Sequence, residues 1–302
     1  MTLNDRRMLL VHAHPDDETI GTGATMAKYV EDGAKVTLVT CTAGEEGEVL
    51  VPGLVHLASA NEDGLGKHRV GELAEAMRIL GVTDHRFLGG FGHFRDSGMK
   101  WGDDGHATAA DNTRPDTFWH SDLTDAANIL VEIIRTEKPQ VVITYDQFGG
   151  YGHPDHVQAH RVTTYAVALA AAPSYRHDLG DAWDVPKVYW SAMSASRMAA
   201  GIRQLRESGD STSFEGMDPD NLPPFAVPDS DLSSAIDGGE FVDRKMDALR
   251  AHATQVAVDG PFFALSNNIG SKVWGTEFYR LVKGRPGPAG PSGFEEDLFA
   301  GL

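Results

Sequence analysis

The sequence has little cysteine and no excess of positive charge, and each shortage excludes a class of protein. Its single cysteine, Cys41, permits neither an intrachain disulfide nor a zinc site built from cysteines, and this cysteine count suits a reducing cytoplasm. A metal ion would therefore have to be held by histidine and carboxylate side chains. With 26 basic against 44 acidic side chains, the formal net charge is −18. This charge repels phosphate groups, so neither a nucleic acid nor an anionic membrane is expected as a partner.

Long apolar runs are also missing. The most apolar segment covers residues 166–172, far short of the roughly 18 residues that suggest a membrane span. Near the beginning of the chain, the apolar run at 8–11 is too short for a secretion signal. The 302 residues, 41% hydrophobic and 23% charged, are instead typical of a large globular α/β domain, alone or with a small cap. The sequence thus predicts a soluble cytoplasmic protein and leaves its oligomeric state open.

Strand-like and helix-like segments alternate through the first 172 residues. The expected strands are 8–13, 35–41, 86–88 and 140–145, and the expected helices are 19–32, 69–80, 155–171 and one that begins near Ser121. Such alternation is typical of a Rossmann-like α/β fold, a mostly parallel sheet with helices on both faces. We assign residues 1–172 to this core. Residues 173–302 are expected to add a final strand at 186–193, a lid-like loop at 208–233, and C-terminal helical and tail segments that pack on the core.

Two short motifs with the same central residues follow two of the expected strands. His14-Pro-Asp-Asp-Glu18 comes directly after the first strand, and Gly149-Gly-Tyr-Gly-His-Pro-Asp-His156 follows the strand that ends at Tyr145. In each motif a proline fixes φ and begins a helix, which leaves the flanking residues at the turn. Sites in parallel sheets of this class lie outside the C-terminal ends of the strands. We therefore expect the two turns to face the same opening.

The two turns bring ionisable side chains together. These are His14, Asp16, Asp17, His153 and His156. One such turn alone is more often a helix cap, but crowding two of them at adjoining strand ends is costly without a cation, so a metal site is predicted. Two imidazoles and one carboxylate with an open position describe a catalytic zinc site and, equally, a non-haem iron site. Spacing alone does not choose between them.

The carboxylate of Asp16 favours hydrolysis. It lies beside the ligand pair without being needed as a ligand, which is the arrangement of a general base next to activated water. An oxygenase would need a cosubstrate site, typically with a basic anchor, and neither motif contains Arg or Lys. A non-haem iron oxygenase and a catalytically idle sugar-binding protein remain open as alternatives.

Together the two motifs resemble the zinc-dependent de-N-acetylases of the phosphatidylinositol-glycan and LmbE-like family, whose fold is Rossmann-like. Within that family, the chain is similar over nearly its whole length to the deacetylases of the mycothiol pathway, which remove acetate from N-acetylglucosaminyl-inositol. The segments that carry this likeness are 40–42, 45–48, 69–73, 95–99, 149–152, 252–256 and 266–268. The resemblance implies a metal-dependent hydrolase of a linear amide that uses one Zn²⁺ per chain, with Fe²⁺ as the alternative ion, and a small sugar-inositol substrate.

Carried over position by position, the resemblance also implies roles for single residues. It implies His14, Asp17 and His156 as zinc ligands and Asp16 as the base. It implies Tyr151 and His153 at the developing oxyanion, with Asp155 holding His153 in its cationic form. A cationic His153 would either add charge at the oxyanion or protonate the departing amine, and the sequence does not choose between these roles. Contacts to the sugar or inositol hydroxyls are implied for Glu48, Arg69 and Asp96.

A sister enzyme of the same family, the mycothiol-conjugate amidase, shares both motifs and is the nearest alternative. Its pattern places a lysine shortly after the first motif, where this chain has Ile20-Gly-Thr22. It also tends to place a proline between the tyrosine and the histidine of the second motif, where this chain has Gly152. Both departures favour the deacetylase.

Overall fold

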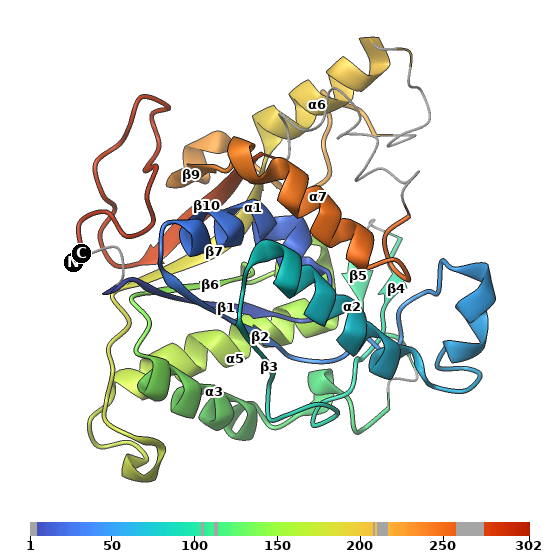
Figure 1. Cartoon of the computed structure of the whole chain (residues 1–302), viewed down its shortest axis with the longest axis horizontal. Helices are drawn as coiled ribbons and strands as arrows, with labels where there is room; N and C mark the ends of the chain where they lie inside the picture. Colours follow the sequence, from blue (N-terminus) through green and yellow to red (C-terminus); the bar gives the residue numbers. More distant parts are fainter. Residues whose placement is uncertain (1–4, 104–105, 112–113, 208, 210–216, 258–274) are drawn as a thin grey trace.

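A computed structural model of the chain describes residues 5–103, 106–111, 114–207, 209, 217–257 and 275–302 (Figure 1). The strands are β1 (Arg7–His12), β2 (Lys35–Thr40), β3 (Asp84–Phe87), β4 (Lys100–Trp101), β5 (Ala107–Thr108), β6 (Val141–Thr144), β7 (Lys187–Ser194), β8 (Ala226–Val227), β9 (Ser234–Asp237) and β10 (Thr276–Lys283). The helices are α1 (Asp17–Glu31), α2 (Leu65–Leu80), α3 (Leu123–Glu137), α4 (Gly149–Gly152), α5 (Pro154–Ala171), α6 (Ala195–Glu207) and α7 (Val242–Ala251). Short 3₁₀ helices are η2 (Pro52–Leu57), η3 (Phe118–His120), η4 (His177–Leu179), η5 (Asp229–Asp231) and η6 (Gly239–Phe241).

One eight-stranded sheet organises the molecule. Its strand order is β3-β2-β1-β6-β7-β10-β9, with β8 paired to β7. The strands from β3 to β7 are parallel, whereas β10 runs antiparallel to both β7 and β9. The chain builds outward from β1 to β3 and then returns to the other side of β1 with β6. The boundary between β1 and β6 is therefore the point where the strand order reverses, and the loops after these two strands diverge there and leave an opening.

Helices cover both faces of the sheet, and each interface is a hydrophobic core. Figure 1 shows α1, α2 and α7 on one face and α3 and α5 on the other. Side chains of β1 alternate between the two cores, with Leu9 and Val11 facing α3 and α5 and Met8 and Leu10 facing the other layer. All four are buried, as expected for a central strand covered on both sides.

Local sequence signals explain where the helices begin and end. Asp122 caps α3, because its side chain accepts hydrogen bonds from the backbone N–H groups of Thr124 and Asp125. Gly81 ends α2 with a φ of 82°, the left-handed conformation that glycine adopts most easily. Pro154 opens α5 behind its cap residue His153, as the second motif predicts.

The Rossmann-like sheet with helices on both faces confirms the expected fold class. The sheet also continues beyond the strand expected at 186–193, since β10 adds to β7 and β9 adds to β10. Of the lid-like loop expected at 208–233, residues 208 and 210–216 lie outside the described residues, and the remainder contains β8 and η5. The likeness at 266–268 also lies outside them.

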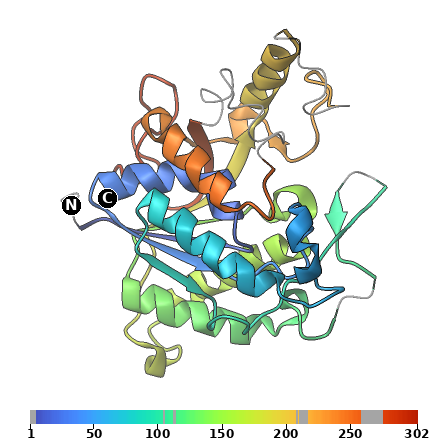
Figure 2. The ribbon, with the colours of Figure 1, turned by 45° about the vertical axis from the view of Figure 1, so that its right-hand side comes forward.

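A small hairpin stands beside the opening. Its strands β4 and β5 pair antiparallel, and β5 contacts α4 (Figure 2). No helix of the described residues is long and apolar enough to cross a membrane.

Candidate metal centre and hydrolytic site

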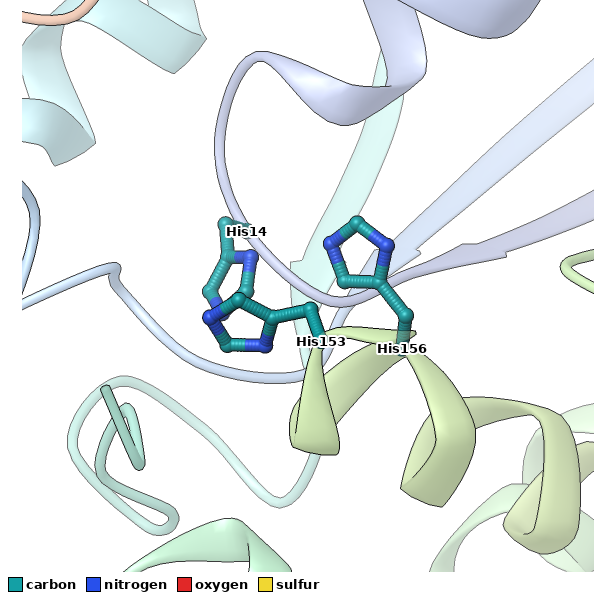
Figure 3. A group of neighbouring side chains, drawn as sticks. All are labelled: His14, His153 and His156. Carbon is teal, nitrogen blue, oxygen red and sulfur yellow. The ribbon is translucent and has the colours of Figure 1, made fainter. Parts of the chain in front are cut away.

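The two motif loops meet at the boundary between β1 and β6. His14 comes from the loop after β1, and His153 and His156 come from the start of α5 (Figure 3). All three are buried, and one ring nitrogen of each lies within 4.8 Å of the others, so the group could hold a metal ion. The strand order thus brings together the two turns, as their position after adjacent strands predicts.

Asp17 joins the two loops. Its Oδ2 lies 3.2 Å from Nδ1 of His14 and 3.3 Å from Nε2 of His156. The same oxygen accepts hydrogen bonds from the Tyr145 hydroxyl at 2.8 Å and from the backbone N–H of His14 at 2.9 Å. Burial alone would raise the pKa of the Asp17 carboxyl, but His156 and His14 outweigh it and hold the pKa well below its usual value. Asp17 therefore places an ionised carboxylate oxygen, a possible metal ligand, between two imidazoles.

His156 is oriented as a ligand. Its Nδ1 lies 3.2 Å from the carbonyl oxygen of Gly149, which can only accept, so Nδ1 carries the proton. The lone pair is then on Nε2, which faces Asp17 and has no hydrogen-bond partner among the described residues. The Tyr145 ring stacks on the imidazole at a centroid distance of 4.2 Å and fixes its plane. A buried lone pair opposite a carboxylate oxygen fits a bound cation.

The surroundings of His14 also favour a positive charge. Burial alone would lower its pKa, but Asp96, Asp155 and Asp17 outweigh burial and raise it well above the usual value. A proton or a metal ion can supply that charge. The donor types and the electrostatics of His14, Asp17 and His156 suit a divalent ion. The groups whose ligand atoms all lie within 4.8 Å of one another are His14 with His153 and His156, and His14 with Asp96 and Asp155.

The carboxylate of Asp155 contacts a different histidine from the one expected. Its Oδ2 lies 3.2 Å from Nε2 of His14, and it accepts hydrogen bonds from the backbone N–H, at 2.9 Å, and the hydroxyl of Ser97. The contact to His153 comes from the backbone of Asp155, whose N–H donates to Nδ1 of His153 at 3.1 Å. The expectation that the Asp155 side chain holds His153 is thus corrected, because Ser97 anchors that carboxylate beside His14.

The surroundings of His153 disfavour a positive charge on its ring. Burial lowers its pKa to about 2, and the neighbouring His14 and His156 lower it further than Asp96 and Asp17 raise it. Since Nδ1 accepts a backbone hydrogen bond as the cap of α5, the proton resides on Nε2. This environment opposes the cationic form that the resemblance implies, and the neutral side chain can act as a hydrogen-bond donor.

Asp16 has the properties of a base beside the ligands. Burial raises the pKa of its carboxyl to about 6, Arg69 opposes this rise, and Asp17 adds to it. Its side chain keeps 15% of its surface exposed, and its Oδ2 lies 3.1 Å from the Arg69 guanidinium. A carboxylate with this pKa can accept a proton near neutral pH.

The three residues expected to contact the substrate differ in their solvent exposure. Arg69 is only 2% exposed, and its guanidinium donates to the carbonyl oxygens of Gly44 and Pro15 as well as to Asp16. Asp96, 4% exposed, accepts hydrogen bonds from the backbone N–H groups of Glu46 and Gly98. Both side chains are therefore used inside the protein. Glu48 is the one of the three whose side chain is exposed.

Tyr151 lies on the outer side of the histidines. Its ring centroid is 5.1 Å from that of His156 and 6.2 Å from that of His153. Burial raises the pKa of its phenol, so the hydroxyl keeps its proton and can donate. Trp101 of β4 follows at 5.9 Å, and its side chain is 61% exposed. A row of rings thus leads from the metal-binding group to the surface.

Two residues of the site were not found from the sequence. The hydroxyl of Tyr145 donates a hydrogen bond to Asp17, and its ring stacks on His156. The sequence could have indicated Tyr145 as a site residue, because it is a hydroxyl-bearing aromatic residue at the end of a core strand beside the first motif. Ser97, which anchors Asp155, lies in the loop before β4, far from both motifs in the sequence. It lies within 95–99, one of the segments that carry the family likeness, but no local pattern assigns it a role.

Comparison with known proteins places this site in a family. The model of the family described as PIG-L, GlcNAc-PI de-N-acetylase, matches residues 9–167, which include both motifs. The chain is 66% identical over 299 residues to the 1D-myo-inositol 2-acetamido-2-deoxy-alpha-D-glucopyranoside deacetylase of Nocardioides sp., with 99% of each chain covered. It is 64% identical over 301 residues to the protein of the same description from Kribbella flavida, again with 99% of each covered.

A solved structure shares the fold. The N,N'-diacetylchitobiose deacetylase from Pyrococcus horikoshii superposes with a TM-score of 0.59 at 19% identity, covering 92% of this chain and 84% of that chain. At that identity the likeness concerns the fold alone. The family match and the two close relatives carry the assignment: the chain belongs to the PIG-L family of GlcNAc-PI de-N-acetylases.

Proposed function

We propose that this protein is a zinc-dependent deacetylase that hydrolyses the acetamide of 1D-myo-inositol 2-acetamido-2-deoxy-α-D-glucopyranoside to acetate and the free amine. The observation that carries the reaction type is the junction at Asp17, where two imidazole nitrogens meet one carboxylate oxygen beside the spare carboxylate of Asp16. The substrate is the one in the description of both close relatives.

The donor set favours zinc. Two imidazoles and a carboxylate are the ligands of many catalytic zinc sites, and such sites keep a further position open. We assign His14, Asp17 and His156 as ligands. His153 also lies within reach of the other two histidines, but its Nδ1 accepts the backbone N–H of Asp155 and its Nε2 carries the proton, so we do not assign it as a ligand. When bound, Zn²⁺ acts as a Lewis acid and makes water nucleophilic near neutral pH.

The chain's own residues supply the proton transfer. Asp16 accepts the proton of the attacking water and returns it to the nitrogen of the departing amine, so the reaction consumes one water and leaves the base ionised. A pKa of about 6 suits both transfers.

Two neutral donors face the developing oxyanion in this proposal. The phenol of Tyr151 and Nε2–H of His153 donate to the carbonyl oxygen as its charge grows. Both groups lie beside His156, and neither has to change its protonation state to donate. Glu48, which is exposed, and the buried Arg69 and Asp96 remain our candidates for contacts to the hydroxyls of the substrate.

The experiment that tests this function measures both products. Protein treated with a chelator is reloaded with Zn²⁺ or Fe²⁺ and incubated with the N-acetyl sugar-inositol, and acetate and free amine are quantified. Equal amounts of both, restored by metal, support the proposal. Product that requires dioxygen would identify an oxygenase, and substrate binding without any acetate would identify a sugar-binding protein.

A second substrate separates the deacetylase from the amidase. Gly152 has a φ of 102°, which proline cannot adopt, so the second motif of this chain has a backbone that the proline-containing pattern does not allow. We therefore expect kcat/KM for the N-acetyl sugar-inositol to exceed that for a mycothiol S-conjugate. A ratio in favour of the conjugate would make the chain an amidase.

A further inference from the structure

The base Asp16 has a strained backbone. Its φ is 114° and its ψ is −37°, although it is not a glycine. L-amino acids rarely adopt this region, and residues persist there only when their surroundings hold them. This conformation directs the Asp16 side chain toward Arg69 while Asp17 turns into α1.

Two side chains hold this turn from opposite sides. Arg69 donates to the carbonyl oxygen of Pro15 and to the carboxylate of Asp16. On the other side, the backbone N–H of Asp16 donates to Oε2 of Glu18 at 2.9 Å. Glu18 is therefore the side chain that fixes the backbone of the base itself.

Glu18 is in turn held by a residue from the far end of the chain. Its carboxylate is fully buried, and its Oε1 accepts from the Thr19 hydroxyl at 2.6 Å. The same oxygen lies 3.0 Å from Nε2 of His252, which is also fully buried and follows the last turn of α7. The two paired residues are 234 positions apart.

The segment that carries His252 is itself anchored. Thr254 donates from its backbone N–H and its hydroxyl to the carboxylate of Glu72 on α2, at 2.9 and 2.7 Å. Its carbonyl oxygen accepts from the backbone N–H of Leu50 at 2.9 Å. His252 thus reaches Glu18 from a fixed support, and its position does not depend on Glu18 alone.

We propose that Glu18 and His252 form a positioning pair for the general base, holding Asp16 in its strained conformation so that its carboxylate faces the reacting water. The inference rests on the proposed function, because it assigns a role in the same reaction. Neither residue contacts the substrate in this account, so both act through Asp16.

The test compares Glu18→Ala and His252→Ala with their conservative variants and a matched control. Glu277 is the control: it is buried, accepts backbone N–H bonds from Ala24 and Thr25 of the same helix α1, and pairs with buried Lys245 at 2.7 Å, but it does not touch Asp16. Glu277→Ala should therefore lower the melting temperature and leave kcat within about twofold.

Glu18→Ala and His252→Ala are expected to lower kcat by about 10- to 100-fold, the scale of a small misplacement of a reacting group. KM and zinc content should stay within about twofold. Glu18→Gln, which keeps an oxygen for the Asp16 N–H, and His252→Gln, which keeps a donor for Glu18, should recover part of the lost kcat. If an alanine variant does not fold, the two glutamine variants still allow kcat to be compared with the wild type.

Amide hydrogen exchange gives a readout that does not depend on activity. Glu18→Ala and His252→Ala should speed exchange of the Asp16 amide, whereas Glu277→Ala should not. If the wild type releases no acetate, the proposed function fails, and the exchange result still decides whether the pair holds Asp16. If both alanine variants keep wild-type kcat and Asp16 exchange while losing stability like Glu277→Ala, the pair is purely structural and the inference is overturned.

Discussion

At the scale of single residues, the two neighbouring carboxylates of the first motif have opposite environments. Asp17 lies between two imidazoles that hold its pKa well below the usual value, whereas burial raises the pKa of Asp16 to about 6. One is suited to bind a cation and the other to exchange a proton. This difference arises from the turn, which directs one side chain between the histidines and the other toward Arg69.

The raised pKa of Asp16 predicts a pH dependence. The base must be ionised to accept a proton, so kcat/KM should fall as the pH decreases through about 6. Arg69 lowers the pKa of Asp16, so Arg69→Met should raise that pKa and move the acidic limb to higher pH. Arg69→Lys, which keeps a positive charge, is the control and should move it less. If the acidic limb of the kcat/KM profile does not move in Arg69→Met, a group other than Asp16 sets its pH.

The sequence predicted the convergence of the two turns better than the hydrogen bonds within them. His14, Asp17 and His156 follow adjacent strands, so their convergence could be inferred from strand order and turn position. The partner of Asp155 could not be inferred, because it depends on Ser97, which arrives from a different loop. The burial that lowers the pKa of His153 is likewise a property of the packed site.

At the scale of elements, α4 and the β4–β5 hairpin form one wall beside Tyr151. Gly152 has a φ of 102°, and a Cβ at this position would lie 2.4 Å from the carbonyl oxygen of Ala107. Only glycine allows this approach without strain. The contact explains how the hairpin reaches the second motif.

Gly152→Ala should therefore push the hairpin away from α4 and displace Tyr151. We expect a loss of about 1–3 kcal/mol in the free energy of unfolding, the usual cost of a strained backbone residue, and a fall in kcat/KM. Denaturant unfolding and steady-state kinetics measure the two effects. The matched control is Gly71→Ala in α2, where a Cβ meets nothing within 4 Å, so activity should be unchanged. If Gly152→Ala and Gly71→Ala lose the same stability and the same kcat/KM, the close approach of Gly152 to Ala107 is refuted.

The parallel half of the sheet was predictable because apolar strands and amphipathic helices alternate in the sequence. The antiparallel edge was not. β9 has only four residues, and β10 has a charged residue at every third position and lies next to a segment outside the described residues. Their pairing with each other and with β7 is a long-range event that local patterns do not reveal.

At the scale of the whole molecule, a buried ion pair ties the C-terminal segment to the sheet. Nζ of Lys187 lies 2.5 Å from Oε1 of Glu295, and both side chains are 1% exposed. The Tyr189 and Ser234 hydroxyls donate to the other carboxylate oxygen. Near the start of the described chain, Arg6 pairs with Asp297 of the same segment at 2.8 Å.

Lys187→Met should leave the Glu295 carboxylate buried without its cation, which costs about 3–5 kcal/mol of unfolding free energy. Urea unfolding measures the loss. The comparison is Lys35→Met, which removes an ion pair to Glu137 from a lysine whose side chain is 50% exposed and should cost about 1 kcal/mol or less. Similar losses for both variants would show that Glu295 is not anchored as described.

Metal binding should also stabilise the fold. An ion that binds only the folded chain adds about 2.7 kcal/mol when its free concentration is 100 times Kd. Chelation should therefore lower Tm by several degrees, and zinc should restore it. In Asp17→Asn the response to chelator should nearly vanish, and a response equal to that of the wild type would contradict the role of Asp17.

The most direct test of the central claim is zinc content measured together with acetate release in Asp16→Asn, Asp17→Asn and His153→Ala. Asp16→Asn should keep stoichiometric zinc and lose about 10²–10⁴ in kcat, because the amide preserves shape but accepts no proton. Asp17→Asn should lose zinc and activity together, and His153→Ala should keep zinc with a lower kcat. If Asp17→Asn retains zinc while Asp16→Asn or His153→Ala is metal-free, the ligand and base assignments at this site are wrong.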